Sequence, residues 1–431
     1  MRISSGMIFD SGVAGIARQT SALLKVQQQL ASGRRALTPG DDPVAAARAL
    51  EISQANDVVT QFASNQKAAN AALGLQDVQL GHAEDLLQRV NELAIQAGGV
   101  AGSPAGRKAV ATELRGIYDQ MLGVANTRDA AGNYVFGGYM SNTTPFGGSI
   151  DSLIAGGEIA YQGDEGQRTL QVSNNRQIAI SDSGIDVFRR IPNGNGFFTT
   201  GYAVGNTGTG AIAAGSVADP AAWRSSAAQN VDVRFTDTAG VITYDLVDTA
   251  TGNSLLTGGA APAPVGNQRS YQNGQLIVLK SQGAESAFDL GGSVAITGSP
   301  AGGDSFSIAP AQTQSVFATV ARMIGALESG GTTPADLTKF SSDIRAGLSG
   351  TSQAMIAIVG FRSEVGTRLN EIEALQNLGG DLSLQYEQTL SELQDLDYAT
   401  AVSELTRKRT ELEAAQQSFL RISQLSLFSL L

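Results

Sequence analysis

Few side chains in this chain of 431 residues are of a type that carries chemistry. There is no cysteine, so disulfides and thiolate metal ligands are impossible, and His82 is the only histidine. Glu84 and Asp85 lie close to His82 and together suggest a ligand cluster. One imidazole beside carboxylates that are its neighbours in sequence is more typical of a solvated helix face. We therefore expect no metal and no cofactor.

Two further motifs admit a chemical interpretation. Adjacent Asp41 and Asp42 suggest the paired acids of a hydrolase, but they precede Pro43, where helix capping explains them better. The glycine-rich run 205–210 lacks a following Lys and Ser or Thr, so turn composition explains it better than a phosphate loop. The β-prone middle of the chain shows no Ser, His and Asp set either. The sequence predicts no catalytic residue, and a hydrolase built on carboxylates alone stays open.

Charge and hydropathy narrow the class of partner. The chain carries 29 Lys plus Arg against 40 Asp plus Glu, a formal net charge of -11, which argues against binding nucleic acid or an anionic membrane. No apolar run approaches the roughly 18 residues of a membrane span, so we expect no membrane insertion. The start of the chain lacks the features of a secretory signal. If the protein leaves the cell, we expect a route without a cleaved signal peptide.

The apolar pattern predicts long helices in the N-terminal part of the chain. Apolar residues recur every seven positions near the N-terminus, at Ile16, Leu23, Leu30 and Leu37, and Gly33 is placed to interrupt this helix. Asp42 and Pro43 then mark a new helix start. Between residues 52 and 97 an apolar seam alternates three and four apart, with Gln66 and Gln76 its only polar members. We favour packing within the subunit over an oligomer seam for this stretch.

The middle of the chain differs from its ends in composition and in predicted secondary structure. Of the 51 glycines, 26 lie between Gly147 and Gly303, and short β-prone runs alternate there with turn residues. Strands are predicted at 168–172, 231–235, 241–244 and 276–279, in one or two small domains. The single tryptophan, Trp223, is expected in their core.

Helix returns near Phe317, restarts at Pro334, and is expected to begin its last segment after Gly379 and Gly380. That segment, which has neither glycine nor proline, carries one apolar stripe: Tyr398, Val402, Leu405, Leu412, Phe419, Ile422 and Leu425. A narrow stripe on so long a helix needs a cover. The N-terminal helix supplies part of it, and other copies or a chaperone supply the rest. We therefore predict an assembly interface here and at Ile16, Leu23 and Leu30, with Leu412 and Phe419 buried only after assembly.

The predicted fold class is α+β multidomain. Long coiled-coil-like helices from both chain ends form a rod, and a β-rich domain is inserted in the middle. We divide the chain into a terminal helical pair at 1–42 with 381–431, a helical rod domain at 43–140 with 311–380, and a β-rich outer insert at 141–310.

Motifs at both ends of the chain resemble the flagellin superfamily. They are Met1–Ser4, Leu30–Arg35, Pro39–Ala47, Leu390–Tyr398 and Ser418–Phe428. Within the superfamily the junction subclass fits better than filament flagellin, which would open with an Ile-Asn-Thr-Asn-like stretch. Residues 134–139 and 161–164 are also similar to the family's entry into its outer domain, whereas 191–310 matches no motif.

The resemblance implies a structural subunit of the bacterial flagellum that joins hook to filament and is not an enzyme. Its implied partners are copies of itself in a ring, neighbouring hook-associated proteins and flagellin. A cytoplasmic export chaperone on the C-terminal helix and an extracellular location reached by the flagellar type III route are implied too. Filament flagellin stays an alternative. A scaffold that displays a glycan-binding or hydrolytic β domain is the alternative from a different class.

Overall fold

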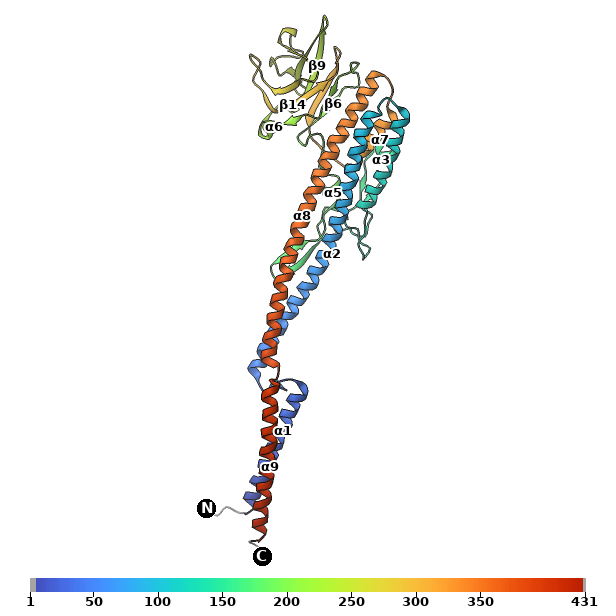
Figure 1. The fold of residues 1–431 in the computed structure, drawn as a ribbon. Coiled ribbons are helices and arrows are strands. Elements are labelled where there is room, and N and C mark those ends of the chain that lie inside the picture. Colours follow the sequence, from blue (N-terminus) through green and yellow to red (C-terminus); the bar gives the residue numbers. More distant parts are fainter. Residues whose placement is uncertain (1–4, 429–431) are drawn as a thin grey trace. The chain divides into compact units, whose positions relative to one another are not determined.

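The computed structural model describes the backbone of residues 5–428 and, apart from residues 5, 6, 8, 335 and 422–428, their side chains. Figure 1 shows long helices from both chain ends and strands from the middle of the sequence. The chain divides into two compact units. The first unit takes in the chain up to Lys67, the short segment Val172–Asn175 and the chain from Glu373 onward, and the second holds the rest. The α+β class predicted from the sequence is confirmed.

Helix α2 (Pro43–Gly99) follows the heptad seam read from the sequence. Gly74 and Gly81 do not interrupt it. Within the second unit its seam residues are almost fully buried in the same chain: Ala69, Leu73, Leu80, Ala83, Leu87, Val90, Ala94 and Ala97. Packing within the subunit is therefore confirmed for this part of the seam. Burial of this stripe, more than intrinsic propensity, stabilises a helix of this length.

The structure explains why two glutamines occur in the apolar seam of α2. Gln66 donates from Nε2 to the carbonyl oxygen of Val172 (2.8 Å), and Gln76 donates to Asp182 Oδ2 (2.6 Å). Asp182 is buried and also accepts both guanidinium nitrogens of Arg368 at 3.0–3.1 Å. An unpaired amide N–H group at either position would cost desolvation energy. Gln66 therefore marks where the strand at residues 169–173 lies against the helix, and Gln76 marks where the loop at residues 180–183 does.

The other helices begin where capping residues place them. Helix α3 (Pro104–Ala125) starts after Ser103, whose side chain accepts from the Gly106 amide, and α7 (Val316–Ser329) starts after Ser315 in the same way. Helix α8 (Pro334–Gln394) begins at the predicted proline. It runs on through Gly379 and Gly380, so the expected break there is wrong. Two glycines cost a long helix only about 1 kcal/mol each, which its packing offsets.

Between α3 and the β domain the chain forms short elements around an aromatic cluster. Phe136, Phe146, Phe188 and Phe317 are fully buried, with ring centroids 5.2–6.0 Å apart. The Tyr161 hydroxyl donates to the carbonyls of Phe136 (3.0 Å) and Asp164 (2.9 Å). The two motifs at 134–139 and 161–164 therefore meet. The elements are β1 (Phe146–Gly147), α4 (Ile150–Ile154), β2 (Ala160–Tyr161), β3 (Thr169–Ser173), β4 (Arg176–Ala179) and α5 (Gly184–Phe188).

The β domain (residues 198–310) is built from two antiparallel sheets over one core. One sheet has the order β11-β10-β9-β15-β6 with β12 beside β10, and the other has the order β13-β14-β7 with β8 beside β14. The strands predicted at 231–235, 241–244 and 276–279 are present in this domain, and the one predicted at 168–172 is present outside it as β3. Trp223 lies in the core as expected. The bounds are β6 (Phe198–Tyr202), β7 (Ala211–Ile212), β8 (Ser216–Val217), α6 (Pro220–Ser225), β9 (Val231–Thr238), β10 (Val241–Asp248), β11 (Asn253–Ser254), the 3-10 turn Val265–Asn267, β12 (Arg269–Ser270), β13 (Leu276–Lys280), β14 (Asp289–Thr297) and β15 (Ser305–Pro310).

A two-stranded ladder stands at the base of this domain. Strand β5 (Ile191–Pro192) pairs with β16 (Thr313–Gln314), so that Pro192 lies opposite Thr313. The chain thus enters and leaves the β domain at one place.

Candidate assembly surface of the terminal helices

The terminal pair consists of α1 (Ser5–Ser32) and α9 (Tyr398–Phe428), which lie side by side within the first unit (Figure 1). Helix α1 ends at Gly33, whose φ of 68° is a left-handed conformation that favours glycine, and whose amide bonds to the Gln29 carbonyl (2.8 Å). The helix therefore ends at the glycine that the sequence indicated.

Beyond the helix end the chain forms a joint, which comprises residues 33–42 and 395–397. The Arg35 amide donates to the Gln394 carbonyl (2.8 Å), and the Leu396 amide donates to the Gly33 carbonyl (2.9 Å). These two bonds tie the residues after α1 to the residues between α8 and α9. Two motifs that lie far apart in sequence, Leu30–Arg35 and Leu390–Tyr398, thus form one piece of structure.

Asp41 and Asp42 serve the joint as hydrogen-bond acceptors. Asp42 Oδ1 accepts from the Ala45 amide (3.0 Å) and caps α2, so the capping interpretation is confirmed. Asp41 accepts from Lys25 Nζ (2.6 Å) and from the Leu37 and Thr38 amides. The Lys25 ammonium and the Thr38 amide lower the pKa of Asp41 to about 2. Both carboxylates are thus committed to structure.

Apolar residues of the terminal pair fall into two groups. The first group is half-buried in the single chain: Ile16, Leu23, Leu30, Leu405, Leu412 and Phe419. The ring of Phe419 lies 5.1 Å from that of Phe9, and a Cβ on Gly12 would come within 2.6 Å of Phe419 Cδ2. Helix α1 thus covers part of Phe419 in the single subunit, and full burial of Leu412 and Phe419 after assembly stays a prediction.

The second group faces outward. Tyr398 and Val402 are 57% and 52% exposed. Five other large apolar residues of the terminal pair are also exposed, although the sequence interpretation missed them: Met7, Phe9, Val13, Leu24 and Leu420. The side chains of Ile422 and Leu425 lie outside the described residues. The doublets Leu23-Leu24 and Phe419-Leu420 were the available signal, because neighbouring apolar residues point to different faces of a helix.

Two grooves lie in the first unit, outside the contact between α1 and α9. One, of about 420 Å³, lies at the joint and is lined by small and apolar residues that include Ala36, Leu37, Ala45, Ala49 and Leu50. The other, of about 320 Å³, is lined mainly by Val59, Phe62, Leu375, Leu378, Leu382 and Tyr386. The second groove, between α2 and α8, is mainly apolar, which is typical of a surface that binds protein.

Groups suited to catalysis do not gather here. His82 is exposed on α2 in the second unit, as the solvated-face interpretation predicts. Among the described residues no group of three or more His, Cys, Asp or Glu side chains is placed to hold a metal ion. Nor does the described part of the chain contain a helix long and apolar enough to cross a membrane.

Comparison with known proteins decides the family. Residues 3–141 match the model of the bacterial flagellin N-terminal helical region. The chain is 24% identical over 430 residues to flagellar hook-associated protein 3 of Escherichia coli, covering 100% of this chain and 99% of that protein. The crystal structure of the flagellar junction protein FlgL from Legionella pneumophila is 31% identical, with a TM-score of 0.69, over 81% of this chain and 100% of that one. This chain belongs to the flagellar hook-associated protein 3 family.

Another solved member of the hook-associated protein 3 family supports the same assignment. The structure of FlgL from Xanthomonas campestris is 28% identical with a TM-score of 0.66, over 79% of this chain and 99% of that one. The resemblance to the flagellin superfamily, and to its junction subclass, is thus confirmed. The relatives carry the name of the hook-associated protein, so filament flagellin is no longer favoured.

Proposed function

We infer that this chain is a structural subunit of the bacterial flagellum that joins the hook to the filament by self-assembly. Its membership of the hook-associated protein 3 family carries the inference. The exposed apolar side chains of α1 and α9 support a role for the terminal pair as the assembly surface, because large exposed apolar patches mark protein interfaces. Each such side chain gains on the order of 1.5 to 3 kcal/mol when it is buried.

The partners in this proposal are copies of the same chain in a ring, neighbouring hook-associated proteins and flagellin. An export chaperone covers the C-terminal helix beforehand, and the subunit is located in the extracellular flagellum. The incomplete burial of apolar side chains in the terminal pair supports the chaperone proposal. Val402 and Leu420 are exposed on α9 and offer a chaperone an apolar face. The domain division 1–42 with 381–431, 43–140 with 311–380, and 141–310 is part of the proposal.

The proposal assigns no catalytic role to the chain. The flagellar relatives are junction proteins by name, and the acids singled out in the sequence are engaged in capping and ion pairing. A structural role accounts for these residues without a substrate.

The sharpest test places a charge on the outward face of α9. Val402→Asp should leave thermal unfolding of the purified subunit unchanged, because Val402 is already 52% exposed there. In the assembled junction an unpaired buried carboxylate costs several kcal/mol in every copy. Cells that carry the variant should therefore make hooks without filaments while still secreting flagellin, as electron microscopy and analysis of the medium would show.

Ser403→Asp is the matched control, since Ser403 is exposed on a different face of the same turn. It should support normal filaments. Normal filaments on Val402→Asp cells would remove this face from the assembly surface, and loss of flagellin secretion would indicate an export defect instead.

A further inference from the structure

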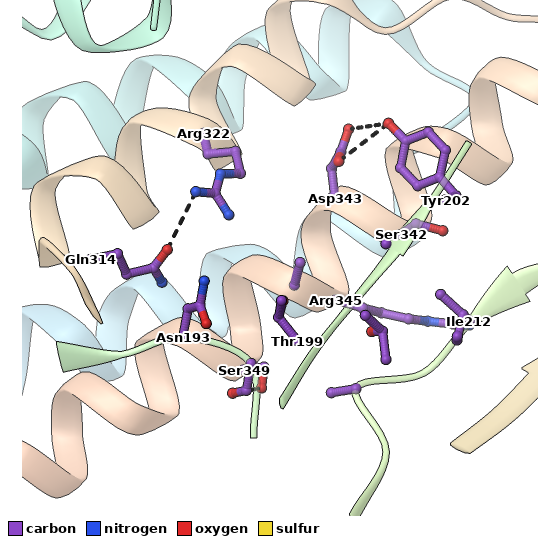
Figure 2. A pocket seen from close by; sticks show the side chains of 15 residues that line it. Asn193, Thr199, Tyr202, Ile212, Gln314, Arg322, Ser342, Asp343, Arg345 and Ser349 are labelled. Atoms are coloured by element: carbon purple, nitrogen blue, oxygen red, sulfur yellow. Dashed lines mark hydrogen bonds between the residues drawn. The ribbon is translucent and has the colours of Figure 1, made fainter. Parts of the chain in front are cut away.

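A polar pocket of about 120 Å³ lies in the second unit, where strand β6 meets helix α8 (Figure 2). One wall consists of residues 193–194 and 199–202, and the other of α8 residues from Ser342 to Ser349. Arg322 of α7 and Gln314 of β16 close one side. The junction role proposed above makes no use of this pocket.

Two acceptors at the pocket have unmet hydrogen-bonding capacity. Ser342 is only 7% exposed, and its hydroxyl has no partner. Among the described residues Asp343 accepts only from the Tyr202 hydroxyl, at 3.4 and 3.5 Å, whereas a good O–H···O bond is 2.5–3.0 Å long. Burial raises the pKa of Asp343 above its usual value, which shows that the carboxylate is poorly compensated. A buried polar group without partners is a place where a ligand gains binding energy.

Two guanidinium groups supply donors beside these acceptors. Arg322 bonds to Gln314 Oε1 at 3.3 Å, and Arg345 reaches Thr297 Oγ1 at 3.5 Å. Within the described residues neither arginine forms an ion pair. Figure 2 shows Tyr202 and Ile212 among the residues that line the pocket, where they add an aromatic and an aliphatic surface.

This set of groups discriminates between classes of ligand. A free anion is disfavoured by the Asp343 carboxylate, and a cation is disfavoured by Arg322 and Lys339, whose charges act on Asp343. An apolar molecule would leave the Ser342 hydroxyl unpaired. Vicinal hydroxyls satisfy both kinds of group, because one hydroxyl can donate to a carboxylate while its neighbour accepts from a guanidinium.

We propose that the pocket between β6 and α8 binds one edge of a sugar residue through a pair of adjacent hydroxyls. The volume of about 120 Å³ corresponds to about four water molecules, enough for one edge of a pyranose ring while the rest stays in solvent. Asp343 accepts from one hydroxyl, Arg322 or Arg345 donates to the other, and Ser342 completes the set. This gives the second unit a binding activity that does not depend on assembly.

Saturation-transfer NMR on the full-length subunit tests the proposal with three probes: the methyl glycosides of glucose, galactose and mannose. At least one should receive saturation at millimolar concentration. Asp343→Asn, which keeps the shape of the side chain, should weaken that binding about tenfold, as expected when a charge-assisted hydrogen bond is lost. Asp119→Asn, an exposed site on α3, is the matched control and should bind as the parent does.

Arg322→Gln guards against a folding artefact, because this exposed residue at the rim can be changed without disturbing the core. It too should weaken glycoside binding while thermal unfolding stays unchanged. The proposal fails if no glycoside binds, or if binding is unaffected in both Asp343→Asn and Arg322→Gln. It also fails if inorganic phosphate displaces the glycoside, since the pocket would then be an anion site.

Discussion

The terminal pair and the β domain bury their apolar side chains to very different extents. In the β domain sixteen core residues are each at most 5% exposed, and they come from both sheets. Among the described side chains of α1 and α9, by contrast, only Val26 and Ala401 are buried apolar residues. The β domain therefore satisfies its own apolar surface, and the terminal pair leaves much of its own exposed. Two isolated helices with so little buried area are marginally stable in water.

This contrast explains how one chain can be both a folded subunit and an assembling one. A segment that leaves burial incomplete gains stability when another protein covers it, and the gain appears as assembly energy. A segment whose core is closed gains nothing from a neighbour. We therefore expect the free energy of unfolding of the β domain to be independent of assembly and that of the terminal pair to depend on it.

Removing the β domain is the most drastic way to test the comparison. Replacing residues 193–312 with a short Gly/Ser turn is feasible because Pro192 and Thr313 already lie opposite each other in the β5–β16 ladder. The shortened chain should lose one thermal transition, seen by calorimetry, and should still be secreted and support filament growth. A stable, secreted chain that grows no filament would show that the β domain takes part in the junction.

A smaller change tests the closed core directly. Phe306 is fully buried and packs edge to face on Phe235, with ring centroids 5.7 Å apart. Phe306→Ala should lower the free energy of unfolding of the β domain by about 3 to 5 kcal/mol. Leu412→Ala, at a half-buried position of the terminal pair, should cost the isolated subunit only about 1 kcal/mol. Chemical denaturation of both purified variants measures the difference, and equal losses would contradict the comparison.

Two glycines in α1 offer a test of how closely α1 packs against α9. A Cβ on Gly12 would meet the Phe419 ring at 2.6 Å, whereas nothing lies within 4 Å of one on Gly15. Gly15→Ala should therefore stabilise α1 by up to about 1 kcal/mol through helix propensity alone. Gly12→Ala should lose that gain because it displaces Phe419. Hydrogen exchange of the α9 amides reports the effect, and equal protection in both variants would show that Phe419 does not pack on Gly12.

Periodicity and capping predicted much of the fold. The α2 seam, the starts at Pro43 and Pro334 and the end of α1 before Gly33 follow from local sequence, because each depends on residues within a few turns. The break expected at Gly379 is absent, since the packing of α8 outweighs the modest cost of glycine. Local signals mark where a helix is free to end, and tertiary contacts decide whether it does.

Sites that depend on long-range contacts were not predictable. Nothing near Gln76 in sequence indicates that Asp182 pairs with it, and only the fold brings Tyr202 to Asp343. The sequence predicted one apolar stripe on α9, and the division of its described residues into a half-buried and an exposed group depends on how α1 lies against it. A heptad indicates which residues share a helix face and leaves the partner of that face undetermined.

The smallest expected effect is a loosening of the terminal pair at low pH, when Asp41 in the joint becomes protonated. Asp41 has a pKa of about 2 in the folded chain against 3.8 for an ordinary aspartate, because it accepts from Lys25 and from the Thr38 amide. A carboxyl whose folded pKa is depressed contributes stability that is fully present above the unfolded value and is lost as pH falls towards the folded one. The terminal pair should therefore loosen between about pH 4 and about pH 2, while the β-domain transition is insensitive to Asp41. The effect is small because this carboxylate is exposed and solvent screens its charge.

In Asp41→Asn the same segment should already exchange faster at neutral pH and lose part of its acid dependence, whereas Asp10→Asn, far from the joint on α1, should match the parent. Hydrogen exchange of α1 and α9 amides across this pH range measures both. An acid dependence that is identical in Asp41→Asn and the parent would show that the Lys25 and Asp41 contact does not hold the joint.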